Sequence, residues 1–185
     1  HELASHTFYH SQFEEAHLQQ SRETLAAIGE QPVVGLRMPR LRPVEMAAVK
    51  AAGYAYDASI NPTFLPGRYN NLHLSRTLYE QEGMKRIPAA VSPHLRIPLF
   101  WLAFKNMPYA LYLRLCRQCL ETDGCLSLYF HPWEFTDVRG WNLPTYTTRW
   151  CGPDLLARLQ RLLQDLSPHG EYKRMADYAA AHPSP

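Results

Sequence analysis

Apolar residues recur along this chain with two different periods, and these periods predict helices that alternate with short strands. Helical spacing predicts helices from Phe13 to Ile28, from Pro43 to Ala52 and from Pro108 to Thr122. A glycine follows each of these segments within two residues, as is usual where a helix ends. A fourth helix is predicted by six leucines that share one broad face: Leu155, Leu156, Leu159, Leu162, Leu163 and Leu166.

Short apolar runs between these helices predict the strands. They cover residues 32–37, 54–57, 85–88 and 125–130. Asn-Pro, Pro-Gly and Asn-Asn pairs predict a loop between Asn61 and Ser75. Strands that alternate with helices indicate an α/β fold with parallel strands. No repeat or linker interrupts this pattern, so residues 1–185 are expected to form a single domain.

Three of the predicted strands end at charged or ionisable side chains, namely Arg37, Asp57 and His131. Active sites of α/β folds gather at the carboxyl ends of parallel strands, so all three are candidate site residues. Each also has a structural interpretation: Arg37 can form an ordinary salt bridge, Asp57 can begin a turn, and His131 can cap its strand. In the functional interpretation, Arg37 orients a catalytic carboxylate and His131, polarised by Asp57, acts as a general acid.

Two histidines near the start of the chain, His6 and His10, have the spacing of a metal-binding pair. If the segment is helical, residues four positions apart lie on one face and both imidazoles can reach one ion. The chain has 9 histidines, so chance spacing of ordinary surface or core residues is the alternative. Two imidazoles do not complete a catalytic metal site, which needs a third ligand such as a carboxylate.

Composition argues against several classes of protein. The chain is 46% hydrophobic and 19% charged, as in folded proteins, and its net charge of +2 gives no broad cationic surface for nucleic acid. No apolar stretch is long enough to cross a membrane. The 4 cysteines indicate no disulfide framework and favour a reducing compartment such as the cytoplasm. Cys116 and Cys119 are expected to pack as small apolar residues in a helix.

Aromatic residues are frequent, with 11 tyrosines, and this composition is compatible with a glycan-binding cleft. The candidates for stacking against a sugar ring are Tyr69, Trp101, Trp133 and Trp141. Packing in the core or at its rim is the alternative role for each of them.

Four short motifs follow one another along the chain: His6-Thr7-x-x-His10, Arg37-x-Pro39, Tyr56-Asp57-Ala58-Ser59 and Leu128-x-x-His131-Pro132. In this order they resemble the motifs of the polysaccharide deacetylases with a NodB homology domain, also called carbohydrate esterase family four. The last motif is similar to that of bacterial members that read H-P-W-E-F, as residues 131–135 do here. The resemblance extends over essentially the whole chain.

The resemblance implies a distorted (β/α) barrel and a metal-dependent hydrolase that removes N-acetyl groups from the amino sugars of a glycan, such as an exopolysaccharide. It implies that His6 and His10 bind a divalent metal ion, for which zinc is expected. Arg37 would hold the base carboxylate, and His131 would be the catalytic acid. Asp57 is the candidate partner of His131 from its position at a strand end, not from the resemblance. The same resemblance implies that Pro39 lines the substrate groove. Tyr69 and Trp133 are substrate-binding candidates because their aromatic rings can stack on a sugar.

The family's first motif, an aspartate-bearing strand, would lie before His1. That motif supplies the base and the third metal ligand, so the resemblance implies that residues 1–185 lack the first strands of the barrel and are inactive alone. Two alternatives remain open. One is a catalytically inactive glycan-binding or scaffold protein on the same fold. The other is a structural zinc module in which the two histidines join Cys116 and Cys119.

Overall fold

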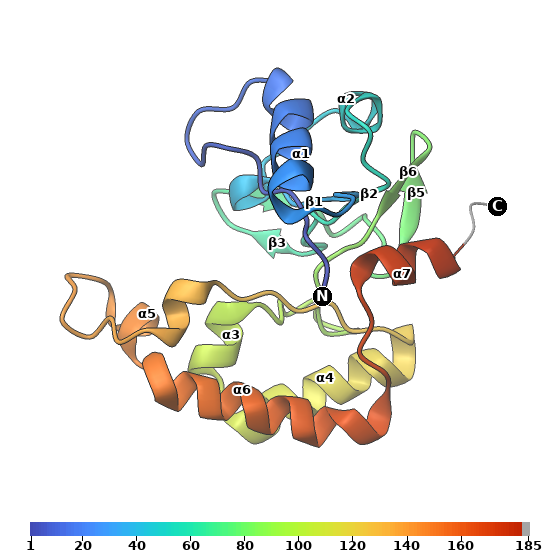
Figure 1. Ribbon diagram of the computed structural model, residues 1–185. Coiled ribbons are helices and arrows are strands. Elements are labelled where there is room, and N and C mark those ends of the chain that lie inside the picture. The colour runs from blue at the N-terminus through green and yellow to red at the C-terminus, as the bar shows by residue number, and fades with distance from the viewer. Residues whose placement is uncertain (183–185) are drawn as a thin grey trace. The chain divides into compact units, whose positions relative to one another are not determined.

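The chain folds as a mixed α/β protein, and a computed structural model describes residues 1–182 (Figure 1). The chain divides into two compact units. The first unit consists of residues 1–61 and 77–88 together with the residues from Lys173 onward. The second unit consists of residues 62–76 and 89–172. The expectation of one domain over the whole chain stays a prediction.

A four-stranded sheet forms the centre of the first unit. Its strands are β1 (Gly35–Leu36), β2 (Tyr56–Asp57), β6 (Met84–Arg86) and β5 (Tyr79–Gln81), in that spatial order. β1, β2 and β6 are parallel, whereas β5 forms an antiparallel hairpin with β6. The parallel pairing confirms the α/β class that the alternating pattern predicts.

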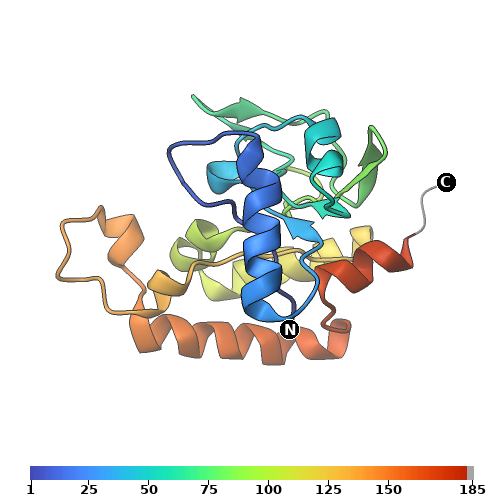
Figure 2. The same cartoon turned by 45° about the horizontal axis from the view of Figure 1, so that its top comes forward.

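Two helices cover this sheet with apolar side chains. α1 (Ala16–Gly29) lies beside β1 in both Figure 1 and Figure 2, and α2 (Met46–Ala51) lies between β1 and β2 along the chain. Their apolar faces enclose a core of fully or almost fully buried side chains, which includes Leu18, Leu36, Met38, Met46 and Val49. α7 (Met175–Ala181) completes the unit, and its Ala176 N–H donates to the Glu2 carboxylate at 3.0 Å.

The second unit is mainly helical. α4 (Tyr109–Asp123) and α6 (Gly152–Leu166) lie side by side in Figures 1 and 2 and share one apolar core with α3 (Trp101–Asn106). α5 (Thr145–Thr148) and the hairpin of β3 (Phe64–Leu65) and β4 (Tyr69–Asn70) are short additions. Within residues 1–182, three short 3₁₀ helices occur: η1 (Pro39–Leu41) in the first unit, with η2 (Pro132–Phe135) and η3 (Ser167–His169) in the second.

Most of the predicted elements form at or near their expected positions. The predicted helices correspond to α1, α2, α4 and α6, and three predicted strands correspond to β1, β2 and β6. On α6, Leu155, Leu162 and Leu166 are buried, while slightly less than half of the surface of Leu156 and of Leu163 remains exposed. The buried face of this helix is therefore narrower than the leucine pattern suggests.

Three expectations differ from the structure. The strand predicted at residues 125–130 is wrong, because that segment forms no regular element. Among residues 1–182 its one backbone hydrogen bond to a neighbouring segment is from Ala90 N–H to the Ser127 carbonyl oxygen, at 2.8 Å. α3 lies in an apolar segment for which no helix was expected. The loop at residues 61–75 contains the β3–β4 hairpin.

Neither sheet closes into a barrel within residues 1–182, where β1 and β5 are the outermost strands of the larger sheet and Ser5 forms an isolated bridge to β1. No helix in this range is both long and apolar enough to span a bilayer.

Gly35 is required by the close approach of β1 and β2. A Cβ atom at this position would lie 2.1 Å from the Tyr56 hydroxyl oxygen. The Tyr56 ring is buried and its hydroxyl donates to Glu2 at 2.7 Å, so the ring has no free space into which it can move. Burial, together with the neighbouring Glu2, raises the pKa of Tyr56.

We expect Gly35→Ala to lower the free energy of unfolding by about 1–3 kcal/mol, the usual cost of overpacking a core. Gly140→Ala is the control, because a Cβ there meets no atom within 4 Å. Urea unfolding followed by circular dichroism measures both variants. Equal stability of Gly35→Ala and the unsubstituted chain would show that the β1–β2 contact is loose.

Candidate functional site

The two histidines of the first motif lie together in the first unit. Their ring centroids are 5.1 Å apart and the rings meet edge to face. The segment is not helical; the backbone turns at Thr7, which has a left-handed φ of 57°. The histidines are therefore brought together by a loop rather than by the helical turn that their spacing suggests.

Strand pairing fixes the position of His6. Ser5 pairs in parallel with Leu36: Ser5 N–H donates to the Gly35 carbonyl at 2.8 Å, and Arg37 N–H donates to the Ser5 carbonyl at 2.9 Å. His6 therefore emerges next to the carboxyl end of β1. There its Nδ1 donates to the Arg37 carbonyl oxygen at 2.6 Å.

The separation of these two rings is that of two ligands of one metal ion. Two imidazoles bound to a tetrahedral zinc ion at about 2.0–2.1 Å have ring centroids roughly 5 Å apart. Metal-binding histidines also commonly donate their second ring N–H to a backbone carbonyl or a carboxylate. His6 does so, and this bond places its lone pair on Nε2.

A third protein ligand is not part of this arrangement. Among residues 1–182, no group of three or more His, Cys, Asp or Glu side chains is placed to hold a metal ion. The local backbone is nevertheless strained, because a β-branched residue such as Thr7 rarely adopts positive φ, and such strain costs about 1–3 kcal/mol. Strain of this kind is concentrated at functional sites.

Arg37 and Pro39 lie at the end of β1. Pro39 is buried at the start of η1, so little of its surface can contact a ligand in this structure. Arg40 and Leu41 follow with left-handed φ values of 55° and 54°. Met38 N–H donates to Ser59 Oγ at 2.7 Å, which ties the turn after β1 to the turn after β2.

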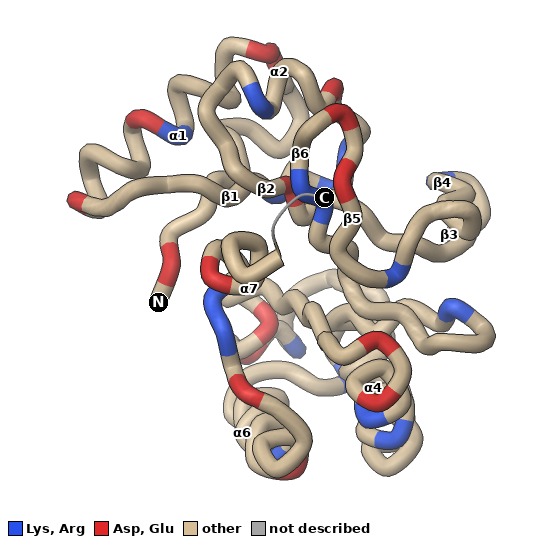
Figure 3. Tube along the Cα trace, turned by 90° about the vertical axis from the view of Figure 1, so that its right-hand side faces the viewer, with Lys and Arg blue, Asp and Glu red and all other residues tan. Residues whose placement is uncertain are grey.

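Asp57, at the end of β2, is completely buried and pairs with a cation on the next strand. Its carboxylate accepts from Arg86 Nε at 2.9 Å and from Ser59 N–H at 3.0 Å, and it also accepts from the Ser59 hydroxyl. Acidic and basic segments meet where β2 and β6 run side by side in Figure 3. The carboxylate oxygens of Asp57 are therefore occupied by this network.

His131 has a different carboxylate partner from the one that the sequence suggests. It begins η2, and Glu134 Oε1 accepts from both its backbone N–H, at 2.8 Å, and its ring Nδ1, at 2.7 Å. Glu134 is completely buried, whereas about a third of the His131 side chain is exposed. The imidazole is therefore fixed at Nδ1 by Glu134, and the rest of the ring is partly exposed to solvent.

Aromatic rings surround His131. Trp133 stacks on the imidazole with a centroid distance of 5.6 Å, and Trp101 meets it edge to face at 5.4 Å. Trp133 is 40% exposed, which suits a side chain that stacks on a ligand. Of the two remaining aromatic candidates, Tyr69 lies half-buried on β4 and Trp141 is exposed.

The candidates thus fall into two groups. His6, His10, Arg37, Pro39 and Asp57 belong to the first unit, where His6 and Arg37 are in direct contact. Tyr69, His131 and Trp133 belong to the second, where His131 and Trp133 are in contact.

Sequence reasoning missed three charged partners. Glu134 was detectable, since it stands three residues after a residue that begins a helical turn, which is the spacing of a capping box. Arg86 and Lys105 have no comparable local signal. Lys105 lies within the apolar segment that forms α3, and its ammonium is 3.6 Å from Glu134 Oε2.

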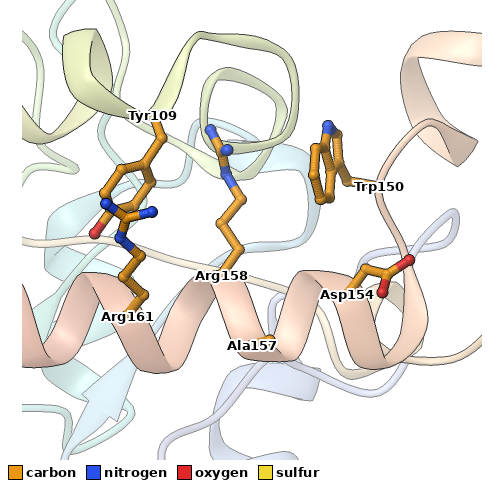
Figure 4. Close-up of a pocket in the computed structure, with 6 residues that line it drawn as sticks. All are labelled: Tyr109, Trp150, Asp154, Ala157, Arg158 and Arg161. Atoms are coloured by element: carbon orange, nitrogen blue, oxygen red, sulfur yellow. The ribbon is translucent and has the colours of Figure 1, made fainter.

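A pocket of about 330 Å³ in the second unit contains none of the predicted site residues (Figure 4). Its central side chain is Arg158, which donates to the carbonyls of Phe104 at 3.0 Å and Met107 at 2.7 Å. The guanidinium also lies over the rings of Tyr109, at 5.3 Å, and Trp150, at 5.5 Å. Burial lowers the pKa of Arg158. These contacts join α6 to α3, which is a structural role.

Comparison with models of known protein families, with curated proteins and with solved structures gives no match. Functional inference therefore depends on the geometry of this chain and on its motifs.

The Asp57–Arg86 pair is expected to be important for stability. Arg86→Met leaves a buried carboxylate without its cation, which typically costs about 3–5 kcal/mol. Urea unfolding measures the loss. Arg174→Met is the matched control, because its pair with Asp177 is about half exposed and should contribute little. Similar losses in the two variants would contradict a special role for the buried pair.

Proposed function

We propose that this protein is a metal-dependent N-deacetylase that acts on the amino sugars of a glycan, with a fold of the NodB-homology barrel type. The order of the four motifs supports the proposal, as does the parallel sheet with Arg37 and Asp57 at its carboxyl edge. The third metal ligand and the catalytic base are assigned, in this proposal, to aspartates that the resemblance places before His1.

One observation carries the proposal: the pairing of His6 with His10. Their rings have the separation of two zinc ligands, and the Arg37 carbonyl accepts the Nδ1 proton of His6. Arg37 lies next to His6, and in the motif this arginine is the residue that holds the base carboxylate. A bound zinc ion would supply polarisation of the acetamide carbonyl and of a water molecule.

His131 performs the proton transfer to the leaving group in this proposal. Its Nδ1 is held by Glu134, so the opposite ring nitrogen, Nε2, is the atom that gives a proton to the departing amine. The anionic Glu134 stabilises the imidazolium that is present before this transfer, by the same principle as the carboxylate of a catalytic triad. The oxygen of the water bonds to the carbonyl carbon while the base of the proposal takes its proton. The C–N bond of the amide then breaks, and acetate and a free amino sugar leave.

A glycan-binding protein without catalysis is the second candidate. The specific observation in its favour is the partly exposed aromatic surface of Trp101 and Trp133, which contact each other with centroids 5.5 Å apart. Such a protein would bind N-acetylated glycans and release no acetate. Measuring acetate release beside glycan binding distinguishes the two functions.

A structural zinc module with Cys116 and Cys119 is disfavoured by the state of the thiols. Both side chains are buried in the α4 core, and this burial raises the pKa of each thiol to about 12. Zinc binds the thiolate form. Cys119 Sγ also donates to the Val91 carbonyl at 3.2 Å.

The decisive experiment measures acetate release from chitooligosaccharides and other N-acetylated glycans by the protein expressed from its complete gene. We expect turnover with zinc and none after chelation. Changing the aspartates of the upstream motif to Asn should abolish turnover without unfolding the protein. If residues 1–185 alone release acetate, a carboxylate within this chain supplies the base, and the assignment to upstream aspartates is wrong.

The metal ligands are tested in the same protein. His6→Ala and His10→Ala should each abolish stoichiometric zinc binding and acetate release together, because a two-ligand site does not retain the ion firmly. Atomic absorption after dialysis measures the zinc. His94→Ala and Cys116→Ser are controls that should change neither quantity. Zinc retained in the double histidine variant would place the metal elsewhere.

The acid is tested by His131→Ala. We expect zinc content to stay unchanged and kcat to fall about a hundredfold or more, the usual contribution of a general acid. The pH–rate profile should lose its alkaline limb. A variant that keeps this limb would show that a different group protonates the amine.

A further inference from the structure

A buried lysine lies next to the His131–Glu134 pair. The Lys105 side chain is 0% exposed and donates to the Thr147 carbonyl at 2.9 Å. Its ammonium lies over the rings of Trp101, at 5.4 Å, and Trp133, at 5.2 Å. These are the same two rings that contact the imidazole of His131.

The Lys105–Glu134 pair is a weak source of stability. Its ammonium nitrogen and Glu134 Oε2 are 3.6 Å apart, and no residue in the described range donates a hydrogen bond to Oε2. Removing two charges from water is costly, and this cost is offset only when the remaining lone pairs are hydrogen-bonded. The geometry therefore points to a role for this pair other than stability.

The two oxygens of Glu134 face different partners. Oε1 accepts both hydrogen bonds of His131, and Oε2 faces the ammonium of Lys105. The cation thus fixes the rotation of the carboxylate. A fixed carboxylate in turn keeps the Nδ1 proton of the imidazole directed inward.

We propose that Lys105 is a positioning residue that acts through Glu134 to hold His131 in the Nδ1–H tautomer, with Nε2 available for proton transfer. The consequence for catalysis depends on the proposed deacetylase function. The positioning itself does not, so it can be tested without substrate.

The test is side-chain NMR of the ¹⁵N-labelled chain, with long-range proton–nitrogen spectra recorded where the imidazole is neutral. His131→Gln identifies the His131 signals by their loss. In the unsubstituted chain we expect a single Nδ1–H tautomer. In Lys105→Met, which keeps the length of the side chain without its charge, we expect both tautomers of His131 in comparable amounts.

Two further variants make the result decisive. Arg76→Met removes the ion pair with Asp123, elsewhere in the same unit, and should leave the tautomer unchanged. The double variant Lys105→Met/Glu134→Gln removes both buried charges and should fold even if Lys105→Met does not, because it leaves no unpaired charge in the interior. A glutamine amide can accept from Nδ1 or donate to it, so both tautomers are expected there as well.

The proposal is overturned if Lys105→Met retains a single Nδ1–H tautomer of His131. If Lys105→Met does not fold, the same result in the double variant overturns it. Loss of the single tautomer in Arg76→Met would also overturn it, because the effect would then be a general loosening of the unit. In the active enzyme, we expect Lys105→Met to lower kcat by about tenfold to a hundredfold and to leave KM unchanged, as for other residues that orient a catalytic group. The two proposals can fail separately. If the unsubstituted protein releases no acetate but the tautomer changes as described, the deacetylase function is wrong and the positioning by Lys105 is supported.

Discussion

The buried carboxylate of Asp57 is the point at which the three parallel strands of the first unit are tied together. It pairs with Arg86 on β6 and accepts from Ser59, whose hydroxyl oxygen in turn accepts from the backbone of Met38 after β1. A buried carboxylate is tolerated only when its oxygens are satisfied, so these partners must all be in place. The segment with His6 and Arg37 lies directly against this edge of the sheet.

Two ion pairs in the described part of the chain, Asp57–Arg86 and Lys105–Glu134, are buried on both sides and contrast in geometry. The oxygens of Asp57 accept close hydrogen bonds from a guanidinium and from a neighbouring serine, whereas Lys105 faces an oxygen of Glu134 at 3.6 Å. The first arrangement has the hydrogen bonds that offset desolvation, and the second leaves one oxygen without them. The same kind of pair thus supports the fold in one unit and is better suited to orienting an imidazole in the other.

The extent to which the sequence predicts this structure depends on whether a signal is local. Helices α1, α2, α4 and α6 combine apolar periodicity with a glycine or a clear leucine face, and they form as expected. The run at residues 125–130 is as apolar as a buried strand, but a strand also needs neighbours with free backbone groups, which an apolar pattern does not report. The spacing of His6 and His10 predicts their proximity, although the backbone that produces it is a strained loop. Arg86 and Lys105 meet their partners through strand register and helix packing, which are long-range properties that a local motif does not encode.

The contact between Arg158 and the end of α3 has a consequence for the order in which the second unit assembles. α3 spans only residues 101–106, too short to be stable by itself, and two carbonyls at its end are satisfied by a side chain from α6, about fifty residues further along the chain. α3 also carries Trp101 and Lys105. The surroundings of His131 therefore form only once α6 has docked, so folding of the local turn at His131 does not by itself prepare the histidine for chemistry.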